Sequence, residues 1–354
     1  MVDAYPSYLG DLEPSQPALL TVAGLRKSFG SRSSQVAALN AVELAVYEGE
    51  LLSLLGPTGS GKSAVLSVVA GVERPDSGRI LLAGEEVPKG SHAIGLASTA
   101  FAPRHTVHDV LTAALKTGGV GRRETDAELG DVLKRIGYLG DPEARAGELP
   151  AQHQLLVALA AQAAAGAQVV LLDDPLNPVD RTLRDRVQDE IRVAQEEFGL
   201  TLVVATRNAQ QALSLSDRIA VILDGRIVQT GPPQEVYELP ASEEVAALIG
   251  PVNLIPPAAS VQLLAQAATF SVRPEKIRIV GEGHLAAPDE VLAGGTVLRT
   301  VYGGPTSTVT VRLDAEGVEV QVLRLNSTAP EEIPVVGGQR VTVVWPRRHA
   351  VRFA

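Results

Sequence analysis

Cysteine is absent from this sequence of 354 residues, and aromatic residues make up only 3% of it. Without thiols the chain forms no disulfide and no thiolate metal site. Basic residues are outnumbered as well: the net charge is -10, so no broad cationic surface is expected to coat nucleic-acid phosphates. DNA and RNA are therefore not expected as partners.

The first 20 residues lack a basic segment followed by an apolar core; they are acidic and contain proline, so we expect no signal peptide. The charge-free stretch 155–172 is long enough to raise the question of a membrane span. It is rich in alanine and glutamine and is interrupted at Gly166, which favours a buried helix followed by a core strand. We expect no transmembrane segment.

The most specific motif is GPTGSGKS at 56–63, which matches the phosphate-binding pattern G-x-x-x-x-G-K-[ST]. An apolar run at 51–55 precedes it and a helix-like stretch at 64–70 follows, as the motif requires. Glycines let the backbone N–H groups and the helix N-terminus surround a polyphosphate. Lys62 is expected to reach the β- and γ-phosphates and Ser63 to hold Mg²⁺. The predicted nucleotide-binding residues here are Gly56, Pro57, Thr58, Gly59, Ser60, Gly61, Lys62, Ser63 and Ala64.

Residues 1–17 are interpreted as a flexible lead. Over 18–250, strand-like apolar runs alternate with helical segments, which predicts an α/β domain with a buried parallel core. The expected core strands are 51–55, 169–172, 202–205 and 219–223, and helices are expected at 106–138 with a glycine-rich break at 118–121.

The composition changes at Gly250-Pro251, where we place a domain boundary. From 251 to 354, short β-rich runs recur between turn signals and predict a small barrel or sandwich. These runs are 270–273, 295–302, 307–313, 318–325 and 340–345.

Three longer stretches carry a family resemblance: GVERPDSGRI at 71–80, SDRIAVILDGRIVQTGPPQEVYELP at 216–240, and VRPEKIRI at 272–279. Together with the phosphate loop, they make the chain resemble the ATP-binding subunit of an ABC importer of the polyamine, iron and maltose type. This resemblance implies an α/β P-loop NTPase domain with a helical subdomain at about 100–150, followed by a small all-β, OB-like TOBE barrel with a regulatory role. VRPEKIRI, with Gly303-Gly304-Pro305 after Tyr302, favours the polyamine branch.

In that family, two ATP-binding domains enclose two ATP molecules, each between the phosphate loop of one chain and the signature loop of the other. The resemblance implies ATP and Mg²⁺ as cofactors. It implies as partners a second ABC ATP-binding subunit, identical or paralogous, integral membrane permease subunits, and a solute-binding protein reached through the complex. The implied location is cytoplasmic, on the inner face of the cell membrane.

Two further positions match the family pattern. Phe29 stands where an aromatic ring stacks on adenine, although a core phenylalanine at a strand end is the alternative. Asp173 ends the apolar run 169–172 and is expected to hold Mg²⁺ through water; an aspartate that caps a turn is the alternative here.

Other positions depart from that pattern. Asp174 stands where the family places the glutamate that activates water, and its side chain is one methylene shorter. Arg207 replaces the histidine that contacts the γ-phosphate; it is able to grip that phosphate, or it is an ordinary surface arginine. Ala97 lies nearest the position of the glutamine that helps to place Mg²⁺ and water.

The signature loop reads Leu149-Pro150-Ala151-Gln152-His153 instead of Leu-Ser-Gly-Gly-Gln. Pro150 offers neither hydroxyl nor N–H, and Ala151 and Gln152 add side chains where the backbone approaches phosphate. Pro150 still suits a helix start. His153 is either a substitute ligand or an ordinary helix-surface histidine, and Asp180 is either a residue of the dimer contact or part of a turn.

Two functions remain open from the sequence. One is a working ATPase subunit for import of a polyamine or similar solute, with Asp174 as base and Arg207 in place of histidine. The other is a nucleotide-binding regulatory or structural subunit that does not hydrolyse ATP. This chain carries altered catalytic positions beside its phosphate loop and also an altered signature loop. Weak or absent ATP turnover is therefore expected whether the partner subunit is identical or paralogous.

Overall fold

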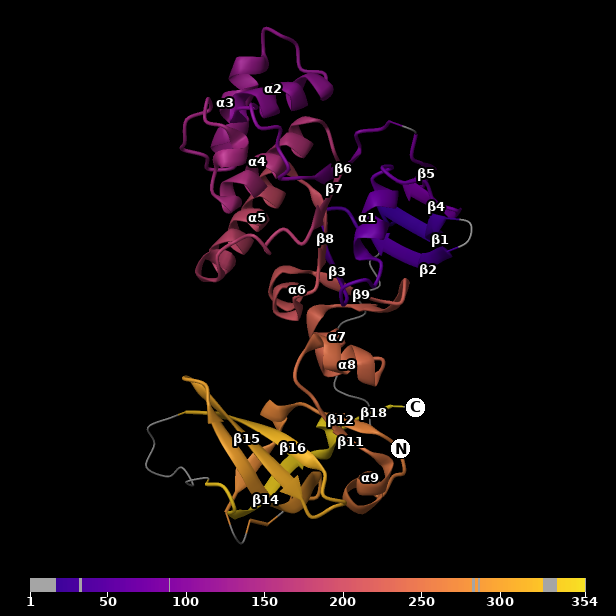
Figure 1. The fold of residues 1–354 in the computed structure, drawn as a ribbon, viewed down its shortest axis with the longest axis vertical. Helices are drawn as coiled ribbons and strands as arrows, with labels where there is room; N and C mark the ends of the chain where they lie inside the picture. Colours follow the sequence, from indigo (N-terminus) through magenta and orange to yellow (C-terminus); the bar gives the residue numbers. More distant parts are fainter. Residues whose placement is uncertain are drawn as a thin grey trace. The chain divides into compact units, whose positions relative to one another are not determined.

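The computed structural model describes residues 17–31, 34–88, 90–281, 284–285, 287–326 and 336–353. The chain forms two compact units, residues 1–233 and 234–354, which are described separately (Figure 1). The lead expected at 1–17 falls outside the described residues, apart from Pro17.

The first unit is organised around a mostly parallel sheet with the strand order β10-β9-β3-β8-β7-β6. Its strands are β3 (Leu51–Leu55), β6 (Ile94–Ala97), β7 (Val169–Asp173), β8 (Thr201–Thr206), β9 (Arg218–Leu223) and β10 (Arg226–Gly231). Strands β3 and β8 are buried along their whole length, which explains their uninterrupted apolar sequences. The parallel core and its four expected strands are confirmed.

An antiparallel sheet in the order β2-β1-β4-β5 lies beside this core. Its strands are β1 (Leu20–Ser31), β2 (Ser34–Val46), β4 (Ser77–Leu82) and β5 (Glu85–Glu86). Helix α1 (Lys62–Val69) packs Val65, Leu66 and Val68 into a core that contains residues from both sheets (Figure 1). Helix α1, which follows the phosphate loop, therefore packs against residues of both sheets.

The first unit also contains several helices besides α1. They are α2 (Val107–Thr117), α3 (Thr125–Arg135), α4 (Ala151–Ala164), α5 (Arg184–Phe198) and α6 (Ala209–Leu215). Helices α2 and α3 share a core with α4 (Figure 1), and Thr106 starts α2 with a capping box closed by Asp109. The helices expected at 106–138 are confirmed, as is the buried helix at the start of the charge-free stretch. Within the described residues, no helix is long and apolar enough to cross a membrane.

The second unit is built on β-structure. One sheet has the order β13-β17-β14-β15-β16 and another the order β11-β12-β18. The strands are β11 (Asn253–Ile255), β12 (Phe270–Val272), β13 (Arg278–Val280), β14 (Glu290–Tyr302), β15 (Thr306–Leu313), β16 (Glu319–Leu325), β17 (Arg340–Pro346) and β18 (Val351–Arg352). The sheet curls around a core that contains Trp345, with the short helix α9 (Pro257–Leu264) packed on it (Figure 1). The expected β-rich C-terminal domain is confirmed.

Two helices that precede the composition change at Gly250 belong to the second unit by their packing. They are α7 (Pro233–Glu238) and α8 (Glu243–Ile249). The buried Arg273 guanidinium, which comes from the VRPEKIRI motif, donates hydrogen bonds of 2.9–3.3 Å to the carbonyl oxygens of Tyr237, Ala246, Gly250 and Pro251. It also lies 4.2 Å from the centre of the Tyr237 ring. One side chain thus ties both helices to the β-structure.

Candidate functional site

The predicted phosphate loop leaves the carboxyl end of β3 and leads into α1. Residues 57–59 and Ser63 are exposed, whereas β3 itself is buried. Gly61 has a φ of 105°, and a Cβ there would lie 2.6 Å from the carbonyl oxygen of Ala38. At Gly56, a Cβ would collide with the carbonyl oxygen of Ile222. Packing therefore demands glycine at both positions and keeps the loop backbone accessible to a ligand.

Lys62, the first residue of α1, folds back over this loop. Its Nζ donates hydrogen bonds to the carbonyl oxygens of Gly56 at 2.8 Å and Pro57 at 2.7 Å. Partial burial lowers the pKa of the ammonium group, while the negative charges of Asp173 and Asp174 oppose this shift. The cation and the two carboxylates therefore belong to one electrostatic neighbourhood. A polyphosphate would offer Lys62 charged acceptors in place of the two neutral carbonyls.

The two acidic residues lie at the end of β7. Asp173 is exposed, and Asp174 follows it with a φ of 47°. The Asp174 backbone N–H donates to the carbonyl oxygen of Ala205 on the neighbouring strand β8 at 2.8 Å. Aspartate adopts this left-handed conformation more readily than most residues. Parallel pairing of β7 and β8 thus brings both carboxylates to the edge of the sheet where β3 delivers the loop.

Asp174 forms an ion pair with Arg207, which follows β8. The Arg207 Nε lies 3.2 Å from Asp174 Oδ2, and the two side chains are 54% and 27% exposed. An Nη2 of Arg207 also donates to Asn177 Oδ1 at 3.3 Å. The Thr206 hydroxyl donates to Gln211 Oε1 at 3.0 Å and lies 3.5 Å from the other Asp174 oxygen. The side chain at the expected base position is therefore held by a cation at the expected histidine position.

The residues present fit a magnesium ion that is held partly by substrate. Ser63 and Asp173 are both exposed and supply one hydroxyl and one carboxylate, the hard oxygen donors that Mg²⁺ prefers. No group of three or more His, Cys, Asp or Glu side chains able to hold a metal occurs in the part of the chain that the structure describes. The donor set thus suits an ion that keeps several waters and binds phosphate oxygens, and does not suit a metal caged by protein alone.

Phe29, predicted to stack on a base, lies near the end of β1. Its side chain is 40% exposed, and the Lys27 ammonium lies 5.0 Å from the centre of the ring. The ring is thus not part of the hydrophobic core. An exposed aromatic face of this kind is available for stacking.

Ala97 is the last residue of β6 and lines a cavity of about 360 Å³. The same cavity is lined by Asp173, Asp174 and Asn177. The methyl group at position 97 offers no hydrogen bond, so the side chain that lines the cavity at this position is apolar. Position 97, where the resemblance implies glutamine, thus lines the same cavity as the two carboxylates.

The altered signature segment begins helix α4. Pro150 precedes its first residue, Ala151, and no side chain caps this end. Gln154 instead donates to the carbonyl oxygens of Leu149 at 2.7 Å and Gly147 at 3.1 Å. The His153 ring packs edge-on against Tyr138 with ring centres 5.9 Å apart. Within its own chain, His153 therefore makes a packing contact inside the helical region.

Asp180 starts a short 3-10 turn at Arg181–Leu183. Its Oδ1 accepts hydrogen bonds from the Thr182 N–H at 2.9 Å and from the Thr182 hydroxyl at 2.8 Å. The backbone hydrogen bond, and then the hydroxyl, lower the pKa of the Asp180 carboxyl group. Asp180 thus serves as a turn cap in the isolated chain, whereas a role in a dimer contact stays a prediction.

The structure brings together the phosphate loop, Asp173, Asp174 and Arg207 at one sheet edge. No contact described for Phe29, for the segment 150–153 or for Asp180 joins them to this group within one chain. The sequence did not predict that Asn177 Oδ1 accepts a hydrogen bond from Arg207, or that the Thr206 hydroxyl lies 3.5 Å from an Asp174 oxygen. The available signal was a polar side chain at the end of β8, Thr206, and one four residues after the end of β7, Asn177.

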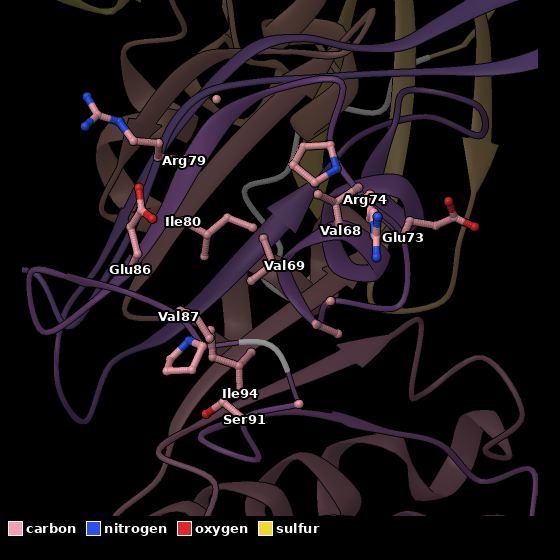
Figure 2. A pocket seen from close by; sticks show the side chains of 16 residues that line it. Val68, Val69, Glu73, Arg74, Arg79, Ile80, Glu86, Val87, Ser91 and Ile94 are labelled. Carbon is pink, nitrogen blue, oxygen red and sulfur yellow. The ribbon is translucent and has the colours of Figure 1, made fainter.

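A second pocket, of about 640 Å³, lies at the other end of α1. Figure 2 shows its apolar floor, formed by Val68, Val69, Ile80 and Ile94. Charged side chains stand around this floor: Arg79 and Glu86 on one side, and Glu73 and Arg74 on the other (Figure 2). Helix α1 thus carries Lys62 and Ser63 at its first turn and lines this pocket with its last turn.

Both the first part and the last part of the chain match known protein families. Residues 39–177 match the family model described as ABC transporter, and residues 270–353 match the TOBE domain. An Fe(3+) ions import ATP-binding protein of Rhizobium etli is 38% identical over 246 residues, which cover 68% of this chain and 69% of that protein. A spermidine/putrescine import ATP-binding protein of Acidothermus cellulolyticus is 33% identical over 371 residues, covering 97% and 96% of the two chains.

Solved structures show the same fold. A chain of an ABC transporter complex from Clostridium perfringens superposes with a TM-score of 0.56 at 23% identity, covering 62% of this chain and 91% of that one. An ATP-binding cassette solved as a dimer with ADP and phosphate gives a TM-score of 0.53 at 22% identity, covering 60% and 98% of the chains.

The fold and the loop define a P-loop nucleotide-binding protein with a C-terminal β domain. With relatives matched over nearly its whole length, the chain belongs to the ABC transporter family, in the group that carries a TOBE domain.

Proposed function

We propose that this chain is the ATP-binding subunit of an ABC importer for a polyamine or a similar small solute, and that it hydrolyses ATP far more slowly than an importer subunit with the usual side chains. The observation that carries the proposal is an intact phosphate loop beside altered catalytic positions. The import roles of the relatives from Rhizobium etli and Acidothermus cellulolyticus support the assignment to import.

Nucleotide binding rests on side chains that the loop holds ready. Lys62 and the loop N–H groups would bind the phosphates, Ser63 and Asp173 would hold Mg²⁺, and Phe29 would stack on adenine. When bound, Mg²⁺ neutralises part of the phosphate charge. This half-site, formed by residues 56–64 with Phe29 and Asp173, lies within a single chain and needs nothing from a partner.

Slow hydrolysis follows from the neighbouring positions. Asp174 has a shorter side chain than glutamate, and Arg207 holds it at 3.2 Å, away from a role as general base. Ala97 cannot position water through a side-chain hydrogen bond. Since a well-placed general base contributes about 10²- to 10⁴-fold to a rate, these changes lower turnover greatly.

The signature segment 150–153 adds a second defect. Pro150 removes the hydroxyl and the N–H expected there, and helix α4 starts without a side-chain cap. In a dimer, one chain would supply the phosphate loop and its partner the signature segment. Each of the two sites therefore receives at least one altered half from this chain, and in a homodimer each site receives both.

The working assembly we propose contains a second ABC ATP-binding subunit, identical or paralogous, with Asp180 and the segment 150–153 at the contact. Permease subunits would hold the pair at the inner face of the membrane and a solute-binding protein would deliver the solute. In this proposal residues 18–250 bind nucleotide, with a helical subdomain at about 100–150, and residues 251–354 regulate.

A second function has one specific observation in its favour. The pairing of Asp174 with Arg207 occupies the very carboxylate that hydrolysis requires. A subunit built in this way is suited to bind ATP and hold a transporter or a paralogous ATPase in one conformation without turnover.

Phosphate release by the purified full chain with Mg²⁺ and ATP separates these functions, with calorimetric nucleotide titration alongside. Slow phosphate release that is absent in the Asp174→Ala variant supports a weak ATPase. Binding without release supports the regulatory subunit. Release at the rate of an ordinary importer subunit contradicts impaired hydrolysis, and failure to bind ATP contradicts both functions.

A further inference from the structure

The ion pair between Asp174 and Arg207 has a consequence for nucleotide choice as well as for hydrolysis. Its atoms lie at the sheet edge beside the phosphate loop, with Arg207 Nε 3.2 Å from Asp174 Oδ2. Asn177 Oδ1 accepts from the same guanidinium at 3.3 Å. Two polar groups on the loop after β7 therefore hold the one cation that β8 brings to this edge.

The local charges come in balanced signs. Asp173 and Asp174 follow one another at the end of β7, Lys62 begins the helix after the phosphate loop, and Arg207 follows Thr206, whose carbonyl oxygen accepts a hydrogen bond from the loop N–H of Gly56 at 3.3 Å. A guanidinium fork binds carboxylate and phosphate oxygens through the same N–H groups, so the two anions compete for it. While Arg207 is held by Asp174, its charge is largely cancelled for a ligand at the loop.

We propose that Arg207 is a γ-phosphate-binding residue masked by Asp174, so that the natural chain gains little preference for ATP over ADP from this arginine. The inference rests on the proposed nucleotide-binding function. It assigns Asp174 a role as an internal counter-ion and Arg207 a role in nucleotide specificity. Neither role requires that ATP is hydrolysed.

A double-substitution cycle tests the proposal. The variants are Asp174→Asn, Arg207→Gln and the pair together, each titrated calorimetrically with Mg²⁺ and a non-hydrolysable ATP analogue, and separately with ADP. Asparagine is chosen because it keeps the shape of aspartate and tolerates a φ of 47° at position 174. Asp189→Asn, an exposed change on α5, is the matched control for loss of one negative charge.

In the natural background, Arg207→Gln should change the ratio of ATP-analogue to ADP affinity less than about twofold. In the Asp174→Asn background, the same change should lower that ratio about five- to tenfold, a coupling in the range measured for contacting charged residues. Asp189→Asn should leave the ratio unchanged. Thermal unfolding of each variant shows whether the fold is kept.

Arg207→Gln could lower the ratio of ATP-analogue to ADP affinity equally in the natural and the Asp174→Asn backgrounds. That result would mean that Arg207 already binds the γ-phosphate in the natural chain, and it would overturn the masking. No loss in either background would mean that Arg207 does not reach the phosphate, which also overturns it. If the natural chain binds neither nucleotide, the proposed function fails instead, and the two failures are thereby distinguished.

Discussion

The phosphate loop and the neighbouring strand ends share one sheet edge but are constrained in different ways. The loop is fixed by its own packing: a side chain at Gly61 would meet the Ala38 carbonyl oxygen at 2.6 Å. The ends of β7 and β8 instead present exposed or half-exposed side chains, such as Asp173 and Arg207, that the fold does not require. An intact loop is therefore partly a requirement of folding, whereas the fold places no such requirement on the strand-end side chains.

The largest effect is expected at Gly61. Gly61→Ala places a Cβ against backbone at a φ of 105° and should lower the free energy of unfolding by about 3 kcal/mol. Denaturant unfolding followed by circular dichroism measures the change. The matched control is Gly59→Ala, which has a φ of 82° but no atom within 4 Å of the added Cβ, and which should cost about 1–2 kcal/mol. An equal loss of unfolding free energy at the two positions would show that packing against Ala38 does not constrain the loop.

The next largest effect concerns Lys62. Lys62→Ala removes a charged donor to the phosphates and should weaken ATP binding by about 10- to 100-fold, in line with a hydrogen bond to a charged group. Calorimetric titration gives the affinity. Stability should change little, because the side chain donates only to loop acceptors, the carbonyl oxygens of Gly56 and Pro57 and the Ser60 hydroxyl, to which water can donate instead. Unchanged ATP affinity would exclude this loop as the phosphate site.

A smaller effect is expected from restoring the strand ends. The combination Ala97→Gln, Asp174→Glu and Arg207→His should raise phosphate release at least about tenfold, short of the full contribution of a general base because Pro150 is retained. The free energy of unfolding should stay within about 1 kcal/mol, as for partly exposed positions. Asp189→Asn serves as the control. A large loss of stability with no gain in rate would show that these side chains are needed for folding.

The smallest effect is expected at Asp180. Its hydrogen bonds from Thr182 lower the pKa of the carboxyl group in the folded chain. The turn is therefore stabilised at pH values above the usual aspartate pKa of about 3.9, and this stabilisation is lost as the pH falls through the lower pKa of the folded state. An NMR pH titration of the side chain should give a midpoint below that usual value. In the Thr182→Ala variant, which loses the hydroxyl donor, the midpoint should move up toward it; an identical midpoint would contradict a contribution from the hydroxyl.

Much of the fold could be predicted from local signals. The run Leu51–Leu55 and the pattern GPTGSGKS identify strand, loop and helix within a short stretch, and fully buried parallel strands have uninterrupted apolar sequences. The pairing of Asp174 with Arg207 could not be predicted, because it depends on β7 and β8 lying side by side and on the Asn177 amide. Likewise, α7 and α8 join the second unit through Arg273, whose partners are backbone carbonyls that no sequence pattern specifies.

Trp345 gives the molecule a built-in optical reporter. It is the single tryptophan of the chain, it is fully buried, and its indole Nε1 has no hydrogen-bond partner among the described residues. An indole in such an apolar core emits at shorter wavelength than one in water, so emission follows the second unit alone. Because the nucleotide loop belongs to the first unit, a change in tryptophan emission on adding ATP would be a direct spectroscopic sign that the two units communicate.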